Sequence, residues 1–141
     1  YVRTFLEDVD RSKVITAEHA MIRPVTIQVD HEGPKVALQR MREEQVSVLL
    51  TLDRARKYIG YITANDALRL SQAGEKSIQS IIRTDMPTVE PSTVIQDLLP
   101  IISDSPTPIA VVDEGKLRGI LIRGVVLEAL ASEKNGGESH E

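Results

Sequence analysis

Residues 59–70 read Ile-Gly-Tyr-Ile-Thr-Ala-Asn-Asp-Ala-Leu-Arg-Leu, and residues 118–130 read Arg-Gly-Ile-Leu-Ile-Arg-Gly-Val-Val-Leu-Glu-Ala-Leu. An alignment of the two stretches places Gly60 on Gly119 and Leu68 on Leu127. Each stretch predicts a β-strand, a sharp turn and an amphipathic helix in that order. The chain is therefore interpreted as a diverged internal duplication.

The sequence around the first stretch predicts a unit with the order β-α-β-β-α. Pro34 suits the first turn of a helix, and the apolar positions after it recur on one side only. The two strands before the last helix should pair antiparallel across a polar loop. The expected elements are a short leading helix (16–21), a strand (26–29), a helix (34–45), two strands (46–52 and 58–62) and a helix (63–73).

A second unit with the same order follows. Ser92 after Pro91 is a plausible N-cap for its first helix. Pro100 lies inside that helix, where it should cause a kink, a break or an early end. The expected elements are a strand (88–90), a helix from residue 92, two strands (109–113 and 117–122) and a helix to about residue 131.

These patterns predict an α/β (α+β) fold with two three-stranded sheets, helices packed on them, and one core shared about a pseudo-twofold axis. The opening segment resembles the end of an upstream part of a longer protein. The last ten residues have no periodicity and no large apolar side chain. The predicted organisation is a linker (1–15), a first repeat (16–73), an inter-repeat linker (74–85), a second repeat (86–131) and a disordered tail (132–141).

Composition excludes several classes of function. A net charge of −4 argues against a protein that binds nucleic acid by neutralising phosphates. The absence of cysteine rules out disulfides and thiolate metal sites, and the three histidines are too dispersed to predict another metal site. No apolar run is long enough to span a membrane. Neither a nucleophile elbow nor a glycine-rich phosphate loop is present, so we do not expect an enzyme.

Thr63 and Asp66 follow Gly60 at the junction between a strand and a helix. The start of a helix presents backbone N–H groups to an anion. A threonine hydroxyl and a carboxylate three residues later could hold the paired hydroxyls of a ribose. The same Thr-x-x-Asp spacing is also a capping box that satisfies the helix without a ligand. Both interpretations remain open.

The second copy carries Ile122 and Val125 at the positions of Thr63 and Asp66, and it places Arg123 at the turn. A cation near a helix N-terminus opposes the helix dipole, and a bound anion would resolve that conflict. Alternatively, Arg123 points into water. Ile120 and Ile122 either belong to the core or form an apolar shelf for a flat base.

The tandem β-α-β-β-α units and the Gly-x-x-Thr-x-x-Asp motif resemble a pair of cystathionine β-synthase (CBS) domains, or Bateman module. The resemblance covers about residues 16–131. Residues 1–5 and 7–10, together with 108–114 and 119–124, are also similar to the C-terminal part of ATP-binding subunits of glycine betaine/proline betaine ABC importers.

This resemblance implies an ATPase domain upstream of Tyr1 and a membrane permease as partners, with the complex peripheral on the cytoplasmic face of the plasma membrane. It implies that the module forms a homodimer and regulates uptake of osmoprotectants in response to ionic strength or to cyclic di-AMP. Ile120, Ile122 and Arg123 would then hold the nucleotide, with Arg123 at phosphate. The alternatives are a sensor that binds AMP, ADP or ATP at Thr63 and Asp66, and a dimerisation scaffold without a ligand.

Overall fold

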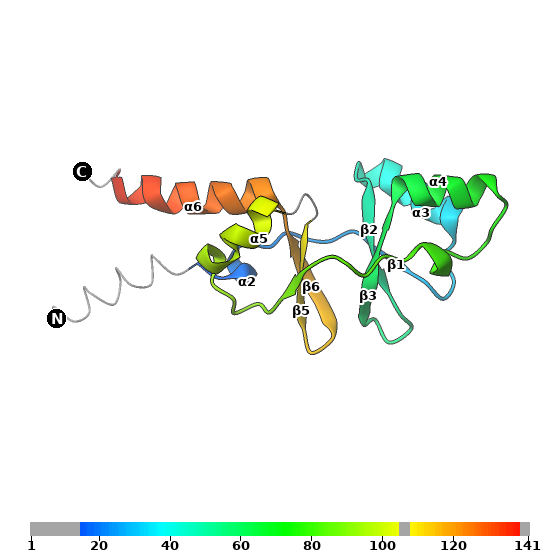
Figure 1. Ribbon diagram of the computed structural model, residues 1–141, viewed down its shortest axis with the longest axis horizontal. Coiled ribbons are helices and arrows are strands. Elements are labelled where there is room, and N and C mark those ends of the chain that lie inside the picture. The colour runs from blue at the N-terminus through cyan, green and yellow to red at the C-terminus, as the bar shows by residue number, and fades with distance from the viewer. Residues whose placement is uncertain (1–14, 105–107, 139–141) are drawn as a thin grey trace. The chain divides into compact units, whose positions relative to one another are not determined.

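The computed structural model describes residues 15–104 and 108–138. Its elements follow the predicted order in both repeats, with two short 3-10 helices in addition (Figure 1). They are α2 (Ala17–Ala20), β1 (Thr26–Gln28), α3 (Pro34–Glu44), β2 (Val48–Leu52), β3 (Tyr58–Thr63), α4 (Ala64–Gln72), η1 (Gln79–Ile81), β4 (Thr88–Val89), η2 (Ile95–Leu98), α5 (Leu99–Asp104), β5 (Ile109–Asp113), β6 (Lys116–Leu121) and α6 (Arg123–Glu138).

The strands form two three-stranded sheets, as predicted, in the orders β1-β2-β3 and β4-β5-β6. In the first sheet, β1 runs parallel to β2, and β3 pairs antiparallel with β2. In the second, β4 runs parallel to β5. The parallel pairs follow from the helix between their strands, because such a crossover returns the chain to the same end of the sheet.

Packing divides the chain into two compact units. One unit comprises Arg23–Met86 and Val112–Arg118, and the other comprises the described residues up to Ile22 together with Pro87–Val111 and the chain from Gly119 onward. The prediction of a single shared core was wrong, because the buried apolar side chains of the described chain form two clusters.

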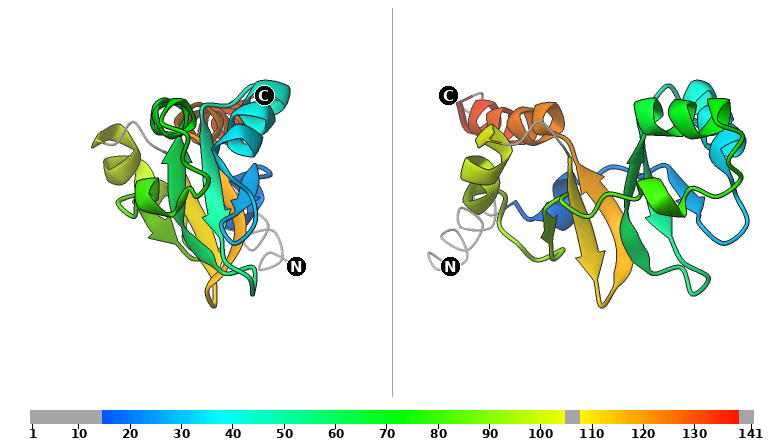
Figure 2. Two further views of the ribbon diagram at one scale, coloured as in Figure 1. Left: turned by 90° about the vertical axis from the view of Figure 1, so that its right-hand side faces the viewer. Right: turned by 45° about the vertical axis from the view of Figure 1, so that its right-hand side comes forward.

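In the unit that holds the first repeat, α3 and α4 lie side by side (Figure 2). Their buried side chains meet those of the sheet in a cluster of Ile27, Val29, Ala37, Met41, Leu49, Ile62, Ala67, Ile78 and Ile81. Two of these residues, Ile78 and Ile81, come from the segment predicted to link the repeats. That segment therefore contributes to the core of the first repeat.

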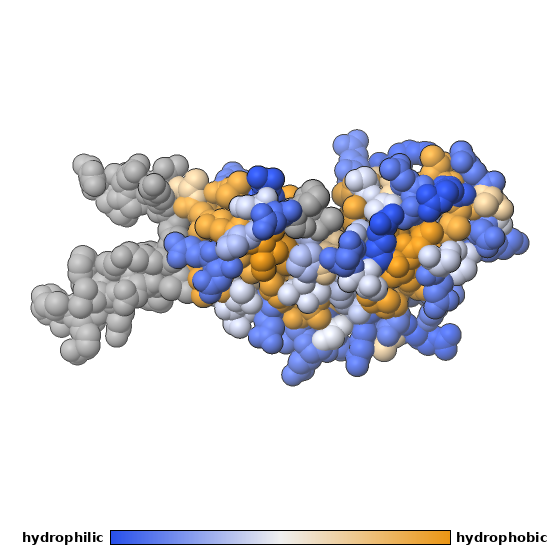
Figure 3. All heavy atoms as spheres, viewed as in Figure 1, coloured by the Kyte–Doolittle hydropathy of each residue, from blue (hydrophilic) through white to orange (hydrophobic). Residues whose placement is uncertain are grey.

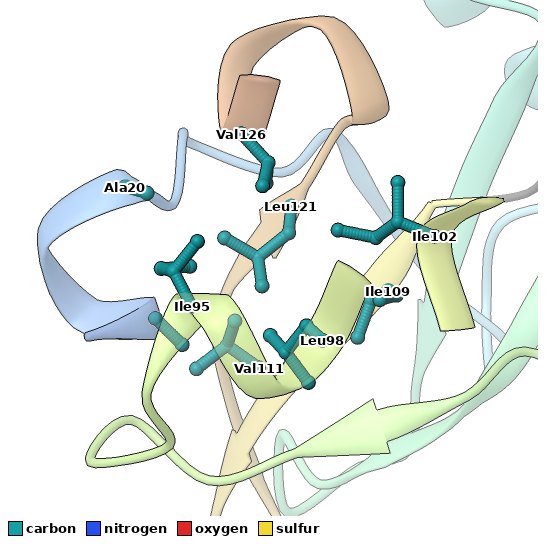
Figure 4. Close-up of a cluster of buried hydrophobic side chains, with 9 residues drawn as sticks. Ala20, Ile95, Leu98, Ile102, Ile109, Val111, Leu121 and Val126 are labelled. Carbon is teal, nitrogen blue, oxygen red and sulfur yellow. The ribbon is translucent and has the colours of Figure 1, made fainter. Parts of the chain in front are cut away.

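In the other unit, the cluster comprises Ala17, Ala20, Ile95, Leu98, Ile102, Ile109, Val111, Leu121 and Val126 (Figure 4). Ala17 and Ala20 come from α2, which the sequence interpretation placed with the first repeat. Backbone hydrogen bonds hold α2 in this unit, from Ala17 N to Thr93 O at 2.8 Å and from Glu18 N to Pro91 O at 2.9 Å. Each repeat is thus completed by the segment that leads into the other repeat.

Two helix boundaries differ from the prediction. The helix expected from Ser92 begins as the 3-10 helix η2 at Ile95, and α5 starts only at Leu99. Pro100 accounts for the break, because its missing N–H is tolerated in the first turn of α5 but not inside a continuous helix. In addition, α6 continues to Glu138 although its end was expected near Ala131. No proline interrupts residues 132–138.

Candidate functional sites

The junction of β3 and α4 places Thr63 and Asp66 together, as their spacing predicts. Thr63 is the N-cap of α4, and its Oγ1 accepts a hydrogen bond from Asp66 N at 3.3 Å. The side chain of Thr63 therefore has a structural use, which supports the capping interpretation of this residue.

Asp66 is buried, with only 5% of its surface exposed. Its carboxylate accepts hydrogen bonds from two arginines. Arg69 Nη2 donates to Oδ1 at 2.8 Å, and Arg83 Nε donates to Oδ2 at 3.0 Å. Arg83 Nη2 also lies 3.0 Å from Oδ2. Burial alone would raise the pKa of Asp66, but the hydrogen bonds from Arg83 and Arg69 outweigh it and lower the pKa. Asp66 is thus held as an anion.

Arg83 is fixed by its backbone as well as by its side chain. Tyr61 N donates to Arg83 O at 2.9 Å, and Arg83 N donates to Tyr61 O at 2.8 Å. The Tyr61 hydroxyl donates to Asp85 Oδ1 at 2.7 Å. This hydrogen bond lowers the pKa of Asp85, while burial and the same bond raise the pKa of Tyr61. Residues 83–85 are therefore attached to β3 and to α4.

Sequence reasoning missed four members of this network, which are Tyr61, Arg69, Arg83 and Asp85. Arg69 had a local signal, because it lies one helical turn after Asp66. Arg83 and Asp85 had no such signal, since the former lies 17 residues from Asp66 and the latter 24 residues from Tyr61. Contacts over such separations depend on the tertiary fold and not on periodicity.

The start of α6 differs from the start of α4. Ile122 occupies the position before the helix and has no side-chain oxygen that could accept from the first N–H groups. Arg123 is exposed, and no ion pair joins it to another residue in the described part of the chain. A β-carbon added to Gly124 would meet nothing within 4 Å. Among the described residues, Ile122 therefore provides no side-chain cap for this helix end, and an exposed cation lies beside it.

The two isoleucines expected beside Arg123 have different surroundings. Ile120 is buried, with 9% of its surface exposed, and its backbone pairs with that of Ile22 through hydrogen bonds of 2.8 and 3.0 Å. Ile122 is 38% exposed. Of the two, only Ile122 offers apolar surface to a ligand.

The five predicted site residues do not form one cluster within a single unit. Thr63 and Asp66 belong to the unit of the first repeat, and Ile120, Ile122 and Arg123 belong to the other. Among the side chains that the structure describes, which lie within residues 15–104 and 108–131, no group of three His, Asp or Glu is placed to hold a metal ion. The described helices include none with both the length and the apolar character needed to cross a bilayer.

Comparison with known proteins identifies the family. The CBS domain family matches residues 9–73 and 78–132, which together are most of the chain. The chain belongs to the CBS domain family. Its two matches correspond to the two repeats, so the chain carries CBS domains in tandem.

Among curated proteins, the tandem CBS domains are similar to "Glycine betaine/carnitine transport ATP-binding protein GbuA" of Listeria monocytogenes serotype 1/2a (strain 10403S). The two sequences are 41% identical over 134 residues, which cover 95% of this chain and 34% of the relative. The chain therefore spans about a third of the length of this relative.

Two solved structures share the fold. CbpB in complex with c-di-AMP has a TM-score of 0.75 and 18% identity, with 99% of each chain covered. CBSX2 in complex with AMP has a TM-score of 0.72 and 23% identity, covering 84% of this chain and 98% of that one. At these identities the likeness establishes the fold of the CBS pair.

Proposed function

We propose that this CBS pair is the regulatory module of an ATP-binding subunit that drives glycine betaine uptake, and that it binds cyclic di-AMP. The 41% identity to GbuA over 95% of the chain supports the transporter assignment. The upstream part of such a subunit would be the ATPase, and its partner would be a membrane permease. The module would then lie at the cytoplasmic face of the membrane and would adjust transport without catalysing a reaction itself.

The observation that carries the ligand proposal is the open start of α6. Ile122 leaves the first N–H groups of the helix without a side-chain cap, and Arg123 has no ion-pair partner in the described chain. A phosphate placed there would accept hydrogen bonds from these N–H groups and from the guanidinium. The exposed side chain of Ile122 would lie against the base. The complex of CbpB with c-di-AMP supports a cyclic dinucleotide as a ligand that this fold can hold.

The proposed mechanism uses two copies of the chain. Cyclic di-AMP carries two phosphates, so one ligand could engage Arg123 of both copies and stabilise one arrangement of the dimer. The ligand can shift the equilibrium only by its difference in affinity between two arrangements. Ionic strength would act on the same equilibrium by screening Arg123.

Pairing of two copies is a second candidate function that a specific observation favours. Leu68 of α4 and Leu127 of α6, which occupy equivalent positions in the two repeats, are 46% and 47% exposed. The space-filling view shows apolar surface among the charged side chains in each unit (Figure 3). Equivalent exposed leucines are suited to contact between copies. A scaffold without a ligand would need only this property, and light scattering at low and high salt would detect the pairing.

Calorimetric titration of the 141-residue chain tests the ligand. We expect Arg123→Ala to weaken cyclic di-AMP binding by at least about tenfold, because it removes charge-assisted hydrogen bonds to phosphate. Arg42→Ala is the matched control, since Arg42 is another exposed arginine on a helix. Equal binding by the wild type and Arg123→Ala would overturn the site. Binding of AMP, lost in Asp66→Ala but not in Arg123→Ala, would support the alternative sensor instead.

A further inference from the structure

Arg83 lies against the first repeat so closely that only glycine fits beside it. A β-carbon on Gly60 would collide with the carbonyl oxygen of Arg83 and would stand 2.9 Å from Ile82 Cγ2. Two backbone hydrogen bonds to Tyr61 fix the same segment. The guanidinium of Arg83 is thereby aimed at the first turn of α4, where it reaches Asp66.

Both carboxylate oxygens of Asp66 accept hydrogen bonds from arginines. Arg69 occupies Oδ1 and Arg83 occupies Oδ2, and the side chain of Asp66 is 7% exposed. The two arginines differ in their attachment: Arg69 belongs to α4 itself, whereas Arg83 comes from the segment between the repeats. The side chain of Arg83 is 51% exposed, so its guanidinium is already partly hydrated and can turn into water, while Arg69 remains as a partner of the carboxylate.

The second repeat has the equivalent backbone hydrogen bonds but no equivalent ion pair. Ile22 pairs with Ile120 by two backbone hydrogen bonds, as Arg83 pairs with Tyr61. The residue equivalent to Asp66 is Val125, and the residue equivalent to Arg83 is Ile22. The ion pair is therefore not needed to build the repeat. It is an addition specific to the first repeat.

We propose that Arg83 is a latch that closes the Thr63–Asp66 site against ligands with paired hydroxyl groups, such as ribonucleosides. Arg83 and the hydroxyls compete for one carboxylate, so the ligand binds only when the latch opens. Salt weakens the attraction between Arg83 and Asp66, so higher ionic strength favours the open latch. The proposal rests on the proposed function only in that the module receives an adenine nucleotide.

AMP is the probe for the closed site, in a calorimetric titration of the 141-residue chain. Arg83→Gln is expected to raise the affinity for AMP by at least about tenfold, within the range of ordinary coupling between sites. Adding Asp66→Asn to Arg83→Gln should remove the gain. Arg42→Gln serves as the control and should bind AMP as the wild type does. An unchanged or lower affinity of Arg83→Gln, in a variant that melts cooperatively, would overturn the latch.

The result is independent of the cyclic di-AMP proposal, because that ligand is assigned to Arg123 in the other unit. Cyclic di-AMP binding with no gain in AMP affinity would remove the latch and leave the proposed function standing. The opposite pattern would remove the Arg123 site and keep the latch.

Amide hydrogen exchange gives a second test that needs no ligand. Raising salt from about 0.1 M to about 1 M shortens the Debye length from about 10 Å to about 3 Å. Exchange of the Tyr61 and Arg83 amides should then accelerate in the wild type but not in Asp66→Asn. The Ile22 and Ile120 amides are the internal control, because they form the same backbone pair without the ions. Equal acceleration of both pairs would contradict the latch.

Discussion

The carbonyl oxygen of Arg83 occupies the space that a β-carbon on Gly60 would need. We expect Gly60→Ala to lower the free energy of unfolding by about 2 kcal/mol, because the colliding atom is backbone and must move. The segment that it displaces carries Arg83, so exchange of the Arg83 amide should accelerate as well. Thermal denaturation and hydrogen exchange measure the two effects.

Two glycines of the second repeat provide controls. A β-carbon on Gly119 would meet Met21 Sδ at 2.7 Å, and this flexible side chain can move; the nearest backbone atom, the carbonyl oxygen of Ile22, lies at 3.0 Å, farther than Arg83 O lies from a β-carbon on Gly60. Gly119→Ala should therefore cost less than Gly60→Ala. Gly124 has open space, and alanine should leave stability unchanged or slightly raised. If the three substitutions had equal effects, close packing at Gly60 would not be the cause.

Thr51 carries a buried hydroxyl without a partner among the described residues. In the register of the sheets, Thr51 pairs with Ile27 as Val111 pairs with Val89. The second repeat thus has valine at the equivalent buried position. We expect Thr51→Val to raise the free energy of unfolding by about 1 kcal/mol, since valine has a similar shape and no polar atom to desolvate.

Thr88→Val is the matched control for this prediction, because Thr88 lies in a strand of the second sheet but is exposed. Urea denaturation should show a gain for Thr51→Val and little change for Thr88→Val. A loss of stability in Thr51→Val would indicate that the hydroxyl has a hydrogen-bond partner in solution, such as water.

The order of elements followed from the sequence because its signals are local. Pro34 marked the start of α3, and the polar loop after β2 marked a hairpin. Thr63 and Asp66 were also found by their spacing, and the N-cap at Thr63 agrees with it. These features depend on residues within one or two turns of each other.

The remaining features depend on contacts between distant residues. The packing of α2 with the second repeat could not be derived from its own sequence, since Ala17 and Ala20 are suited to many cores. The ion pair between Arg83 and Asp66 was hidden for the same reason. The only sign of this contact in the sequence is indirect, because Gly60 is required by the close approach of Arg83, more than 20 residues away.

Ile122 decides whether the start of α6 is available to an anion. Ile122→Thr should place an Oγ1 next to the N–H group of Val125, as Thr63 Oγ1 lies next to Asp66 N. We expect a gain of about 1 kcal/mol in the free energy of unfolding from the new cap. Binding of cyclic di-AMP should weaken, because the cap and the phosphate compete for the same N–H groups.

Ile101→Thr is the matched control for Ile122→Thr, because both isoleucines are 38% exposed. Ile101→Thr should not raise the free energy of unfolding, and it should leave the affinity for cyclic di-AMP unchanged. Tighter binding by Ile122→Thr, measured by calorimetry, would exclude the N-terminus of α6 as the place where phosphate binds.

The arginines around Asp66 should make stability depend on pH in acid. They lower the pKa of Asp66 below its ordinary value of 3.8, so the folded chain binds its proton less readily than the unfolded chain does. The resulting stabilisation is fully present above 3.8 and is lost as the pH falls through the lower folded value. The difference in free energy of unfolding between the wild type and Asp66→Asn should therefore be constant near neutral pH and should shrink as the pH falls below 3.8.

Urea denaturation of both proteins across the acid range measures this difference. Glu32 provides a control, because hydrogen bonds from Arg40 lower its pKa in the same way at a separate place in the same unit. Glu32→Gln should retain the pH dependence that Asp66 causes, whereas Asp66→Asn should lose it. If the free energies of unfolding of the wild type and Asp66→Asn kept a constant difference down to the lowest pH, the pKa of Asp66 would not be lowered in the folded chain.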